Sequence, residues 1–386
     1  MHELEPHLPI DLVSVPIQVT SACPTVYLRE SKLAMTKDDI YLRAEAAADA
    51  ANLRYVSDSE DGYTRARKGK GFAYYAPGGA HVKDETLKKR FKALVIPPMW
   101  NEVWICKDAK GHIQVTGRDD RGRKQYIYHE RWREVRDRAK FDHLIDFAEA
   151  LPGLRGRLYR DMGKDALPKE KVVAAIVKLL ETTLIRVGNK SYAKRNKTYG
   201  LTTLRRKHVD IDGNEIEFSF KGKSGVEHDI SIENPKLARI VKACDELPGY
   251  ELFQYVDDDG ERQNIDSADV NAYLKEVTGR SFSAKDFRTW AATTSTFGHL
   301  YGGEEPQSDE AAKKAISETI KRVAEELGNT PAVCRSSYVH PFLLELYETG
   351  DFHRRAESID ASDAPRGLRK NEHLTCELIR SGLKVS

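Results

Sequence analysis

The sequence lacks the features that mark a membrane-spanning or a secreted protein. None of its 386 residues lies in an unbroken apolar run of about 18 residues, the length that spans a bilayer. The mildly apolar stretch 8–19 has no basic start and is interrupted by Asp11, so we do not interpret it as a secretory signal. The five cysteines stand singly: Cys23, Cys106, Cys244, Cys334 and Cys376. This spacing argues against a zinc site or a disulfide framework and is typical of a reducing cytosol.

The common phosphate-binding and metal-binding motifs are also missing. No glycine-rich loop precedes a Lys-Ser/Thr pair, and no helix carries paired histidines. The segment 210–215 superficially resembles a calcium loop, but its glycine, Gly213, comes at the fourth position instead of the sixth. A hairpin turn explains it better, and the segment 257–260 is predicted to be a turn as well. We therefore expect no metal and no nucleotide cofactor.

The net charge is small, but the charged residues are unevenly distributed. Residues 51–140 hold 21 Lys and Arg against 12 Asp and Glu, a net of +9, which leaves −7 for the remainder of a chain whose total is +2. A basic lobe beside an acidic remainder is typical of a protein with a polyanionic partner, nucleic acid first. An ordinary solvated surface explains the charge alone equally well.

The N-terminal third of the chain divides into two parts. Residues 1–47 are net acidic, with a helix predicted only from 39 to 51, and form an extension of unknown role. Residues 48–130 mix short β-rich runs with turn signals and one helix over 84–94, which predicts a small α+β domain. The predicted strands are Phe72–Tyr75, Glu102–Cys106, His112–Thr116 and Gln125–Tyr128.

Residues 131–350 are mostly helical by pattern. One apolar helix is predicted to run to Val187 and to end at Gly188, and others cover 267–278, 283–301 and 309–327. A period of two over 208–232 predicts a three-stranded meander. Residues 351–386 are expected to be a polar tail with little order. The fold class is therefore α+β: a small N-terminal antiparallel-sheet domain, then a mostly α-helical domain that carries the meander.

Four residues stand out as candidates for chemistry, although each has an ordinary explanation when taken alone. Arg186 is predicted at a helix C-terminus, where the helix dipole favours a cation. Lys223 lies at a hairpin tip, where lysine is usually solvated. The stem of Arg288 can cover an apolar helix face, and Tyr338 can be an ordinary amphipathic side chain on a short helix.

Taken in order along the chain, the segments around these residues resemble the poxvirus-like and bacterial type IB DNA topoisomerases. Asn329-Thr330-Pro331, with Tyr338 nine residues after Asn329, is similar to the nucleophile segment of that family. Thr330 can cap the short helix and Pro331 can open it. The strongest run is Lys197-Thr198-Tyr199-Gly200-Leu201-Thr202-Thr203-Leu204-Arg205, followed by His208-Val209. Gly117-Arg118-Asp119, continuing to Gly122-Arg123-Lys124-Gln125-Tyr126, looks like the family's DNA-contacting strand.

The resemblance runs from about Leu53 to Gly350 and implies a role for each matching residue. Arg186 and Arg288 would grip the non-bridging oxygens of the scissile phosphate, and Lys223 would be the general acid toward the leaving 5′ oxygen. Tyr338 would be the nucleophile that becomes a 3′-phosphotyrosine. Asn329 stands where poxvirus members have histidine and where many bacterial members have asparagine. The implied DNA contacts are Arg118, Arg123, Lys124, Gln125, Tyr126 and Tyr128, with Tyr192 as a weaker candidate.

The implied function is relaxation of supercoiled double-stranded DNA by a monomer that closes as a clamp, in the cytoplasm and nucleoid of a bacterium. Guanidinium forks suit the charge that develops on the equatorial oxygens of the phosphate, and a lysine can protonate the leaving alkoxide. With that much fixed positive charge no metal ion is required. The phosphotyrosine conserves the bond energy, so resealing needs no ATP.

Two other functions fit parts of the pattern. A tyrosine site-specific recombinase uses the same Arg–Lys–Arg–Tyr chemistry on a related helical domain. Recombinases typically have a histidine three residues before the second arginine, where this chain has Lys285, and they lack the basic β domain. A non-catalytic DNA-binding protein would keep the basic lobe alone, and the complete set of four candidate residues argues against it.

Overall fold

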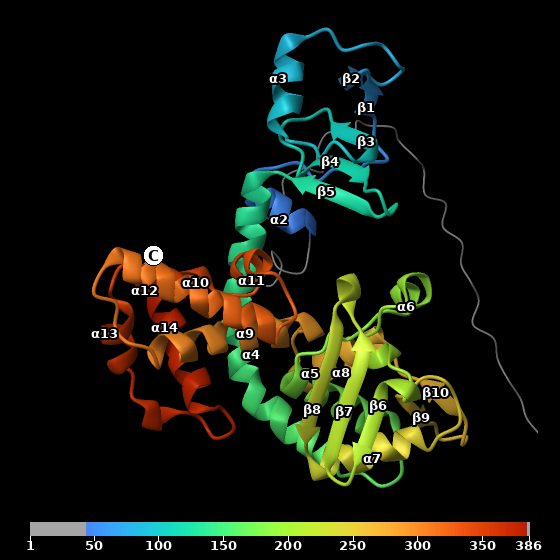
Figure 1. The fold of residues 1–386 in the computed structure, drawn as a ribbon, viewed down its shortest axis with the longest axis vertical. Helices are drawn as coiled ribbons and strands as arrows, with labels where there is room; N and C mark the ends of the chain where they lie inside the picture. The colour runs from blue at the N-terminus through green and yellow to red at the C-terminus, as the bar shows by residue number, and fades with distance from the viewer. Residues whose placement is uncertain (1–43, 384–386) are drawn as a thin grey trace, which may run out of the picture. The chain divides into compact units, whose positions relative to one another are not determined.

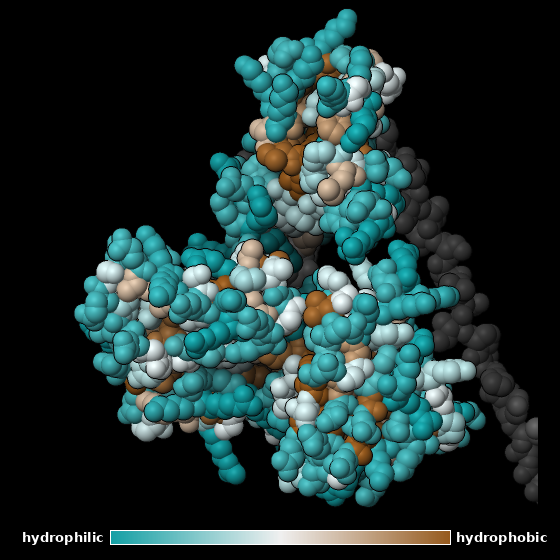
Figure 2. Space-filling model, in the orientation of Figure 1, coloured by the Kyte–Doolittle hydropathy of each residue, from teal (hydrophilic) through white to brown (hydrophobic). Residues whose placement is uncertain are grey.

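The computed structural model describes residues 44–383, and the predicted extension 1–47 lies almost wholly outside this range. The last turns of the predicted 39–51 helix are inside it, as α2 (Ala44–Ala50). Within the described residues, no helix combines the length and the apolar character needed to cross a membrane. Figure 2 shows mainly hydrophilic side chains on the viewed face, with smaller apolar areas between them.

The N-terminal lobe is built on one antiparallel sheet of five strands in the order β2-β1-β3-β4-β5 (Figure 1). The strands are β1 (Gly62–Lys68), β2 (Gly71–Tyr75), β3 (Asn101–Cys106), β4 (Ile113–Arg118) and β5 (Lys124–Tyr128). Helix α3 (Glu85–Ala93) begins where the Asp84 carboxylate accepts the N–H of Thr86 at 2.7 Å, and its buried Phe91 packs on Tyr63 and Tyr74. We did not predict β1, because its sequence is polar. Its extended conformation is stabilised by pairing with β2 and β3.

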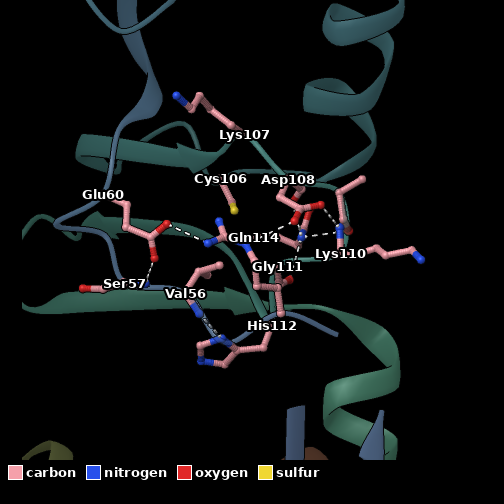
Figure 3. A network of polar contacts seen from close by, with 12 residues as sticks. Val56, Ser57, Glu60, Cys106, Lys107, Asp108, Lys110, Gly111, His112 and Gln114 are labelled. Atoms are coloured by element: carbon pink, nitrogen blue, oxygen red, sulfur yellow. Dashed lines mark hydrogen bonds and ion pairs between the residues drawn. The ribbon is translucent and has the colours of Figure 1, made fainter. Parts of the chain in front are cut away.

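A polar network ties the segment before β1 to the turn between β3 and β4 (Figure 3). The N–H of Val56 donates to Nδ1 of the buried His112 at 3.0 Å, and Gln114 Nε2 donates to the Gly111 carbonyl at 2.7 Å. Burial lowers the pKa of His112, so the ring stays neutral and can accept at Nδ1. These bonds hold the turn in place on the same sheet that ends with β5, the strand predicted to contact DNA.

The helical lobe begins with α4 (Glu130–Asp161), and its helices enclose one large apolar core. The other helices are α5 (Lys169–Thr183), α6 (Lys190–Asn196), α7 (Pro235–Asp245), α8 (Ser267–Thr278), α9 (Ala284–Tyr301), α10 (Asp309–Glu326), α11 (Pro331–Ser337), α12 (Pro341–Glu348), α13 (Phe352–Glu357) and α14 (Lys370–Leu383). The predicted meander is present as β6 (Val209–Asp212), β7 (Glu215–Lys221) and β8 (Glu227–Glu233), and β9 (Gln254–Val256) pairs with β10 (Arg262–Asn264). The α+β class is confirmed.

Helix α5 ends earlier than we predicted. Its last residue is Thr183, and Leu184 takes a left-handed conformation with φ 55°, its N–H bonded to the Leu180 carbonyl. Gly188, the predicted helix end, has φ 97° for another reason: a Cβ there would lie 2.8 Å from Thr203 Oγ1. The glycine therefore permits a close crossing of two segments and does not end the helix.

The prediction of a polar C-terminal tail was wrong. Residues 352–383 form α13, a short 3-10 turn at 361–363 and α14, and Leu374, Leu378 and Ile379 of α14 are buried in the main core. Leu374 and Leu378 are four residues apart, so they share one helix face. Charged residues around these leucines, such as Glu372, Glu377 and Arg380, hide this narrow apolar stripe from a reading of the sequence alone. Glu372 anchors the helix through an ion pair with Arg155 at 2.7 Å.

Candidate active site

The segment that carries Tyr338 is fixed by local capping. Helix α10 ends at Glu326 and is capped by Leu327, and Thr330 then caps α11 by accepting the N–H of Val333 at 3.4 Å. Pro331 opens α11, as its sequence predicts. Tyr338 lies just past the last helical residue of α11 and not within the helix, with φ −129° and ψ −26°.

Two side chains from other helices hold the backbone at Tyr338. The hydroxyl of Thr293 on α9 donates to the Tyr338 carbonyl at 3.1 Å and accepts the His340 N–H at 3.2 Å. Lys140 of α4 donates to the Ser337 carbonyl at 3.1 Å. We did not identify either residue from the sequence. For Thr293 the sequence signal is the threonine-rich composition of α9, because a helical hydroxyl that becomes buried needs a partner.

We expect Thr293→Val to destabilise the fold, because the change leaves a buried carbonyl and a buried N–H without their partner. The cost should be about 1–3 kcal/mol in the free energy of unfolding, measured by urea denaturation. Thr296→Val is the matched control: Thr296 lies on the same helix, is equally buried, and its hydroxyl has no partner among residues 44–383. Equal stability of the two variants would contradict the role given to the Thr293 hydroxyl.

Arg288 joins the ends of two helices beside the tyrosine. It is only 5% exposed on α9, and its guanidinium donates to the Leu184 carbonyl, past α5, and to the Leu327 carbonyl, past α10, the latter at 2.7 Å. Carbonyls at helix C-termini lack partners within the helix and carry the negative end of its dipole. The guanidinium carbon lies 5.4 Å from the centre of the Tyr338 ring. Arg288 thereby sets the positions of both helix ends next to Tyr338.

Arg186 follows α5 in an irregular segment, which corrects our expectation that it lies in the last turn of a helix. Its Nη2 donates to Asn329 Oδ1 at 2.5 Å and lies 3.5 Å from the Gly328 carbonyl. The half-buried guanidinium thus links the end of α5 to the turn that enters α11. Asn329 Nδ2 and Arg288 Nε are buried donors that have no acceptor among the described residues.

Lys223 lies at the tip of the β7–β8 hairpin. The hairpin closes through the Gly222 N–H, which donates to the Val226 carbonyl at 2.7 Å, and the left-handed residues Ser224 (φ 66°) and Gly225 (φ 81°) turn the chain. The Lys223 side chain is exposed. Its ammonium group makes no hydrogen bond or ion pair with any residue in the range 44–383 and can therefore meet a ligand.

The electrostatics of the site make the Tyr338 phenol easier to ionise than an ordinary tyrosine. Burial raises the pKa of Tyr338, but Arg288, through its charge and a hydrogen bond, acts together with the charges of Arg186 and Lys223 to bring the pKa below its ordinary value. Burial lowers the pKa of both arginines, and arginine still keeps its proton in proteins. The structure thus brings three cations predicted from separate segments, Arg186, Lys223 and Arg288, around one phenol. Asn329 joins them through its bond to Arg186. No three His, Cys, Asp or Glu side chains in the described part of the chain gather in a way that could hold a metal ion.

The basic residues predicted to contact DNA in the N-terminal lobe each pair with a carboxylate. Arg118 pairs with Glu102 at 2.8 Å, Arg123 with Asp119 at 2.8 Å and Lys124 with Asp58 at 2.6 Å. All three cations remain largely exposed. The Arg118 and Lys124 pairs lie at the surface and are weak in water, so a phosphate can replace their carboxylates. Asp119 is buried and also accepts from Gln125, so it stays in place beside Arg123.

The predicted aromatic contacts share one face of β5, the edge strand of the sheet. The Tyr126 and Tyr128 rings are stacked with centroids 5.7 Å apart, and Tyr126 is 43% exposed. Strand alternation turns Gln125 to the other face, where its amide donates to Asp119 at 2.9 Å, so the three side chains do not present a single surface. Tyr192 belongs to the helical lobe: it lies on α6 and is 54% exposed.

The chain matches two protein-family models. Residues 129–351 match the catalytic core of eukaryotic DNA topoisomerase I, and residues 71–119 match the N-terminal domain of bacterial DNA topoisomerase IB. DNA topoisomerase 1B of Acanthamoeba polyphaga mimivirus is 34% identical over 295 residues, which cover 75% of this chain and 88% of that protein. DNA topoisomerase I of Monkeypox virus is 24% identical over 259 residues, covering 66% of this chain and 78% of the viral protein.

Proposed function

The chain belongs to the type IB DNA topoisomerase family, and we propose on this basis that it relaxes supercoiled duplex DNA through a covalent bond between DNA and Tyr338. The observation that carries the proposal is the convergence of Arg186, Lys223 and Arg288 on one tyrosine whose pKa they lower. Each residue comes from a different part of the chain, and the phenol oxygen is the nucleophile that they surround.

The proposed reaction exchanges one phosphodiester for another. The Tyr338 phenol loses its proton to water as its oxygen attacks the scissile phosphorus. A new P–O bond to the tyrosine forms, and the bond from phosphorus to the 5′ oxygen breaks. Lys223 gives a proton to that oxygen, so a 5′ hydroxyl leaves. After the free end has rotated, the 5′ hydroxyl attacks the phosphotyrosine and Lys223 recovers the proton. Tyr338 leaves as a phenolate, which takes a proton back from water.

The arginines and Asn329 would stabilise the transition state. Negative charge grows on the non-bridging oxygens as the tyrosine attacks, and fixed guanidinium groups bind it more strongly than they bind the ground state. The buried Arg288 Nε and Asn329 Nδ2 lack protein acceptors, and a phosphate oxygen would supply them. Arg186 is oriented for this role by its bond to Asn329 Oδ1.

A plasmid relaxation assay tests the function directly. Both negatively and positively supercoiled plasmids should relax in EDTA without any nucleotide, since the protein's own cations neutralise the phosphate and the phosphotyrosine stores the bond energy. A recombinase would act only on circles that carry its recognition site. An absolute requirement for magnesium, or for such a site, would reject the proposal.

We further propose that the protein acts as a monomer in the cytosol and nucleoid, with its two lobes closing as a clamp on double-stranded DNA. The net charge of +9 over residues 51–140, which span the N-terminal lobe and the start of α4, supports a DNA-binding role for this part of the chain. Tyr126 and Tyr128 supply an aromatic surface beside Lys124, whose ammonium lies 5.6 Å from the centre of the Tyr126 ring. Arg118 and Arg123 are further exposed cations of the same lobe.

The salt dependence of non-covalent binding tests this surface. If Arg118, Arg123 and Lys124 each neutralise one phosphate, the triple alanine variant should lower the slope of log affinity against log salt by about three units. The matched control replaces three exposed lysines of α10, Lys313, Lys314 and Lys321, by alanine. A slope that is unchanged in the first variant, or equally changed in both, would contradict a specific DNA-binding role for the surface.

A further inference from the structure

His228 lies on β8, and the proposed mechanism assigns it no role. It stands directly opposite Phe220 of β7, and the two rings are stacked with centroids 5.0 Å apart and an interplanar angle of 19°. The ring is half-buried, and no residue in the described range forms a hydrogen bond with it. The ring therefore interacts with its neighbours through van der Waals packing.

The imidazole fills the space beside two glycines that flank active-site residues. A Cβ on Gly222, the residue before Lys223, would lie 2.5 Å from Cδ2 and Nε2 of the ring. A Cβ on Gly328, the residue before Asn329, would lie 2.9 Å from Cε1. The ring is thus wedged between the hairpin tip and the turn that enters α11.

One side of this wedge is firmly fixed. The Gly328 N–H donates to the Glu325 carbonyl at 3.0 Å, and the Asn329 N–H donates to the Ala324 carbonyl at 2.8 Å. The neighbouring Leu327 carbonyl accepts from buried Arg288 at 2.7 Å. The turn at Gly328 is therefore a fixed support for the His228 ring, and the ring in turn fixes the position of the hairpin tip.

We propose that His228 is a positioning residue, whose ring holds the hairpin tip so that the Lys223 ammonium reaches the leaving 5′ oxygen. This inference rests on the proposed function. The ring acts by its shape and not as a cation. Burial lowers its pKa, and Arg186 and Arg288 lower it further, against the opposing charges of Glu227 and Asp229, so the imidazole is neutral at pH 7.

A substrate with sulfur in place of the bridging 5′ oxygen isolates the step in which Lys223 acts, because a thiolate leaves readily without a proton. Single-turnover cleavage by His228→Ala should be about 10–100-fold slower than wild type on the oxygen substrate, a part of the 10²–10⁴-fold that a general acid contributes. On the sulfur substrate His228→Ala should cleave at the wild-type rate. The double variant His228→Ala/Lys223→Ala should be no slower than Lys223→Ala, because the two residues act as one unit.

Further variants separate positioning from general support. His228→Phe keeps a planar ring on Phe220 and should recover most of the lost rate on the oxygen substrate. His353→Ala removes a half-buried ring of α13 outside the site and should leave both rates unchanged. The ratio of the two rates in one preparation does not depend on the fraction of folded enzyme. If His228→Ala is unstable, His228→Gln gives the same ratio with a smaller loss of volume.

The outcomes that overturn the inference are distinct from failure of the function. Equal slowing on both substrates would mean that the ring supports the whole site, and a double variant slower than Lys223→Ala would mean that His228 acts independently. Unchanged rates in His228→Ala would remove any role for the ring. If the wild-type protein formed no adduct at Tyr338 with either substrate, the proposed function itself would fail.

Discussion

Tyr338→Phe should form no covalent protein–DNA adduct while binding DNA as tightly as the wild type does. The substitution removes one hydroxyl and keeps the ring that lies 5.4 Å from the Arg288 guanidinium carbon, so the site should keep its shape. The loss should be complete within detection, since no bond to phosphorus can form without the phenol oxygen. Labelled DNA and denaturing gels measure the adduct, and a binding titration in the same buffer measures the affinity.

Other tyrosines provide the control for this experiment. Tyr192→Phe removes an equivalent hydroxyl from α6, and the adduct should persist in this variant. An adduct in Tyr338→Phe that maps to Tyr301 or Tyr347 would move the active site. Tyr347 is a poor substitute, because it is 2% exposed and its hydroxyl donates to the Glu304 carbonyl at 3.2 Å.

The features that the sequence predicted correctly are those set by near neighbours in the chain. Thr330 and Pro331 start α11 through bonds that span only a few residues, and the meander follows from a period of two over 208–232. The candidate residues themselves came from a resemblance, since Arg186, Lys223 and Arg288 each have an ordinary structural explanation when taken alone. Their convergence on one phenol needs the fold.

The features that the sequence did not predict depend on distant contacts. The end of α5 is set at Leu184, whose carbonyl is bound by Arg288, 104 residues further along the chain. In the sequence His228 is one polar residue of a strand that alternates polar and apolar side chains. Its proposed role becomes visible only in the structure, where Gly222 and Gly328 pack against its ring. We did not predict α14, because its few leucines are recognisable as core residues only once the other helices pack against them.

Lys223→Ala should slow DNA cleavage by about 10²–10⁴-fold, the range for loss of a general acid. The structure makes such a role possible, because Lys223 is exposed at a hairpin tip and its charge already acts on Tyr338. The same loss could arise if the ammonium only bound the phosphate or the DNA. A test must therefore separate proton donation from binding.

The sulfur-bridged substrate makes this separation for Lys223 as well. Lys223→Ala should cleave it nearly as fast as the wild-type protein does, because the thiolate needs no proton. Arg288→Ala is the matched comparison: it removes a cation that contacts Tyr338 and leaves the Leu184 and Leu327 carbonyls without their partner, so it should be slow on both substrates. If Lys223→Ala is equally slow on both, Lys223 is a binding residue, and the proton must come from Arg186 or from Lys221, which is held in an ion pair with Glu227 at 3.4 Å.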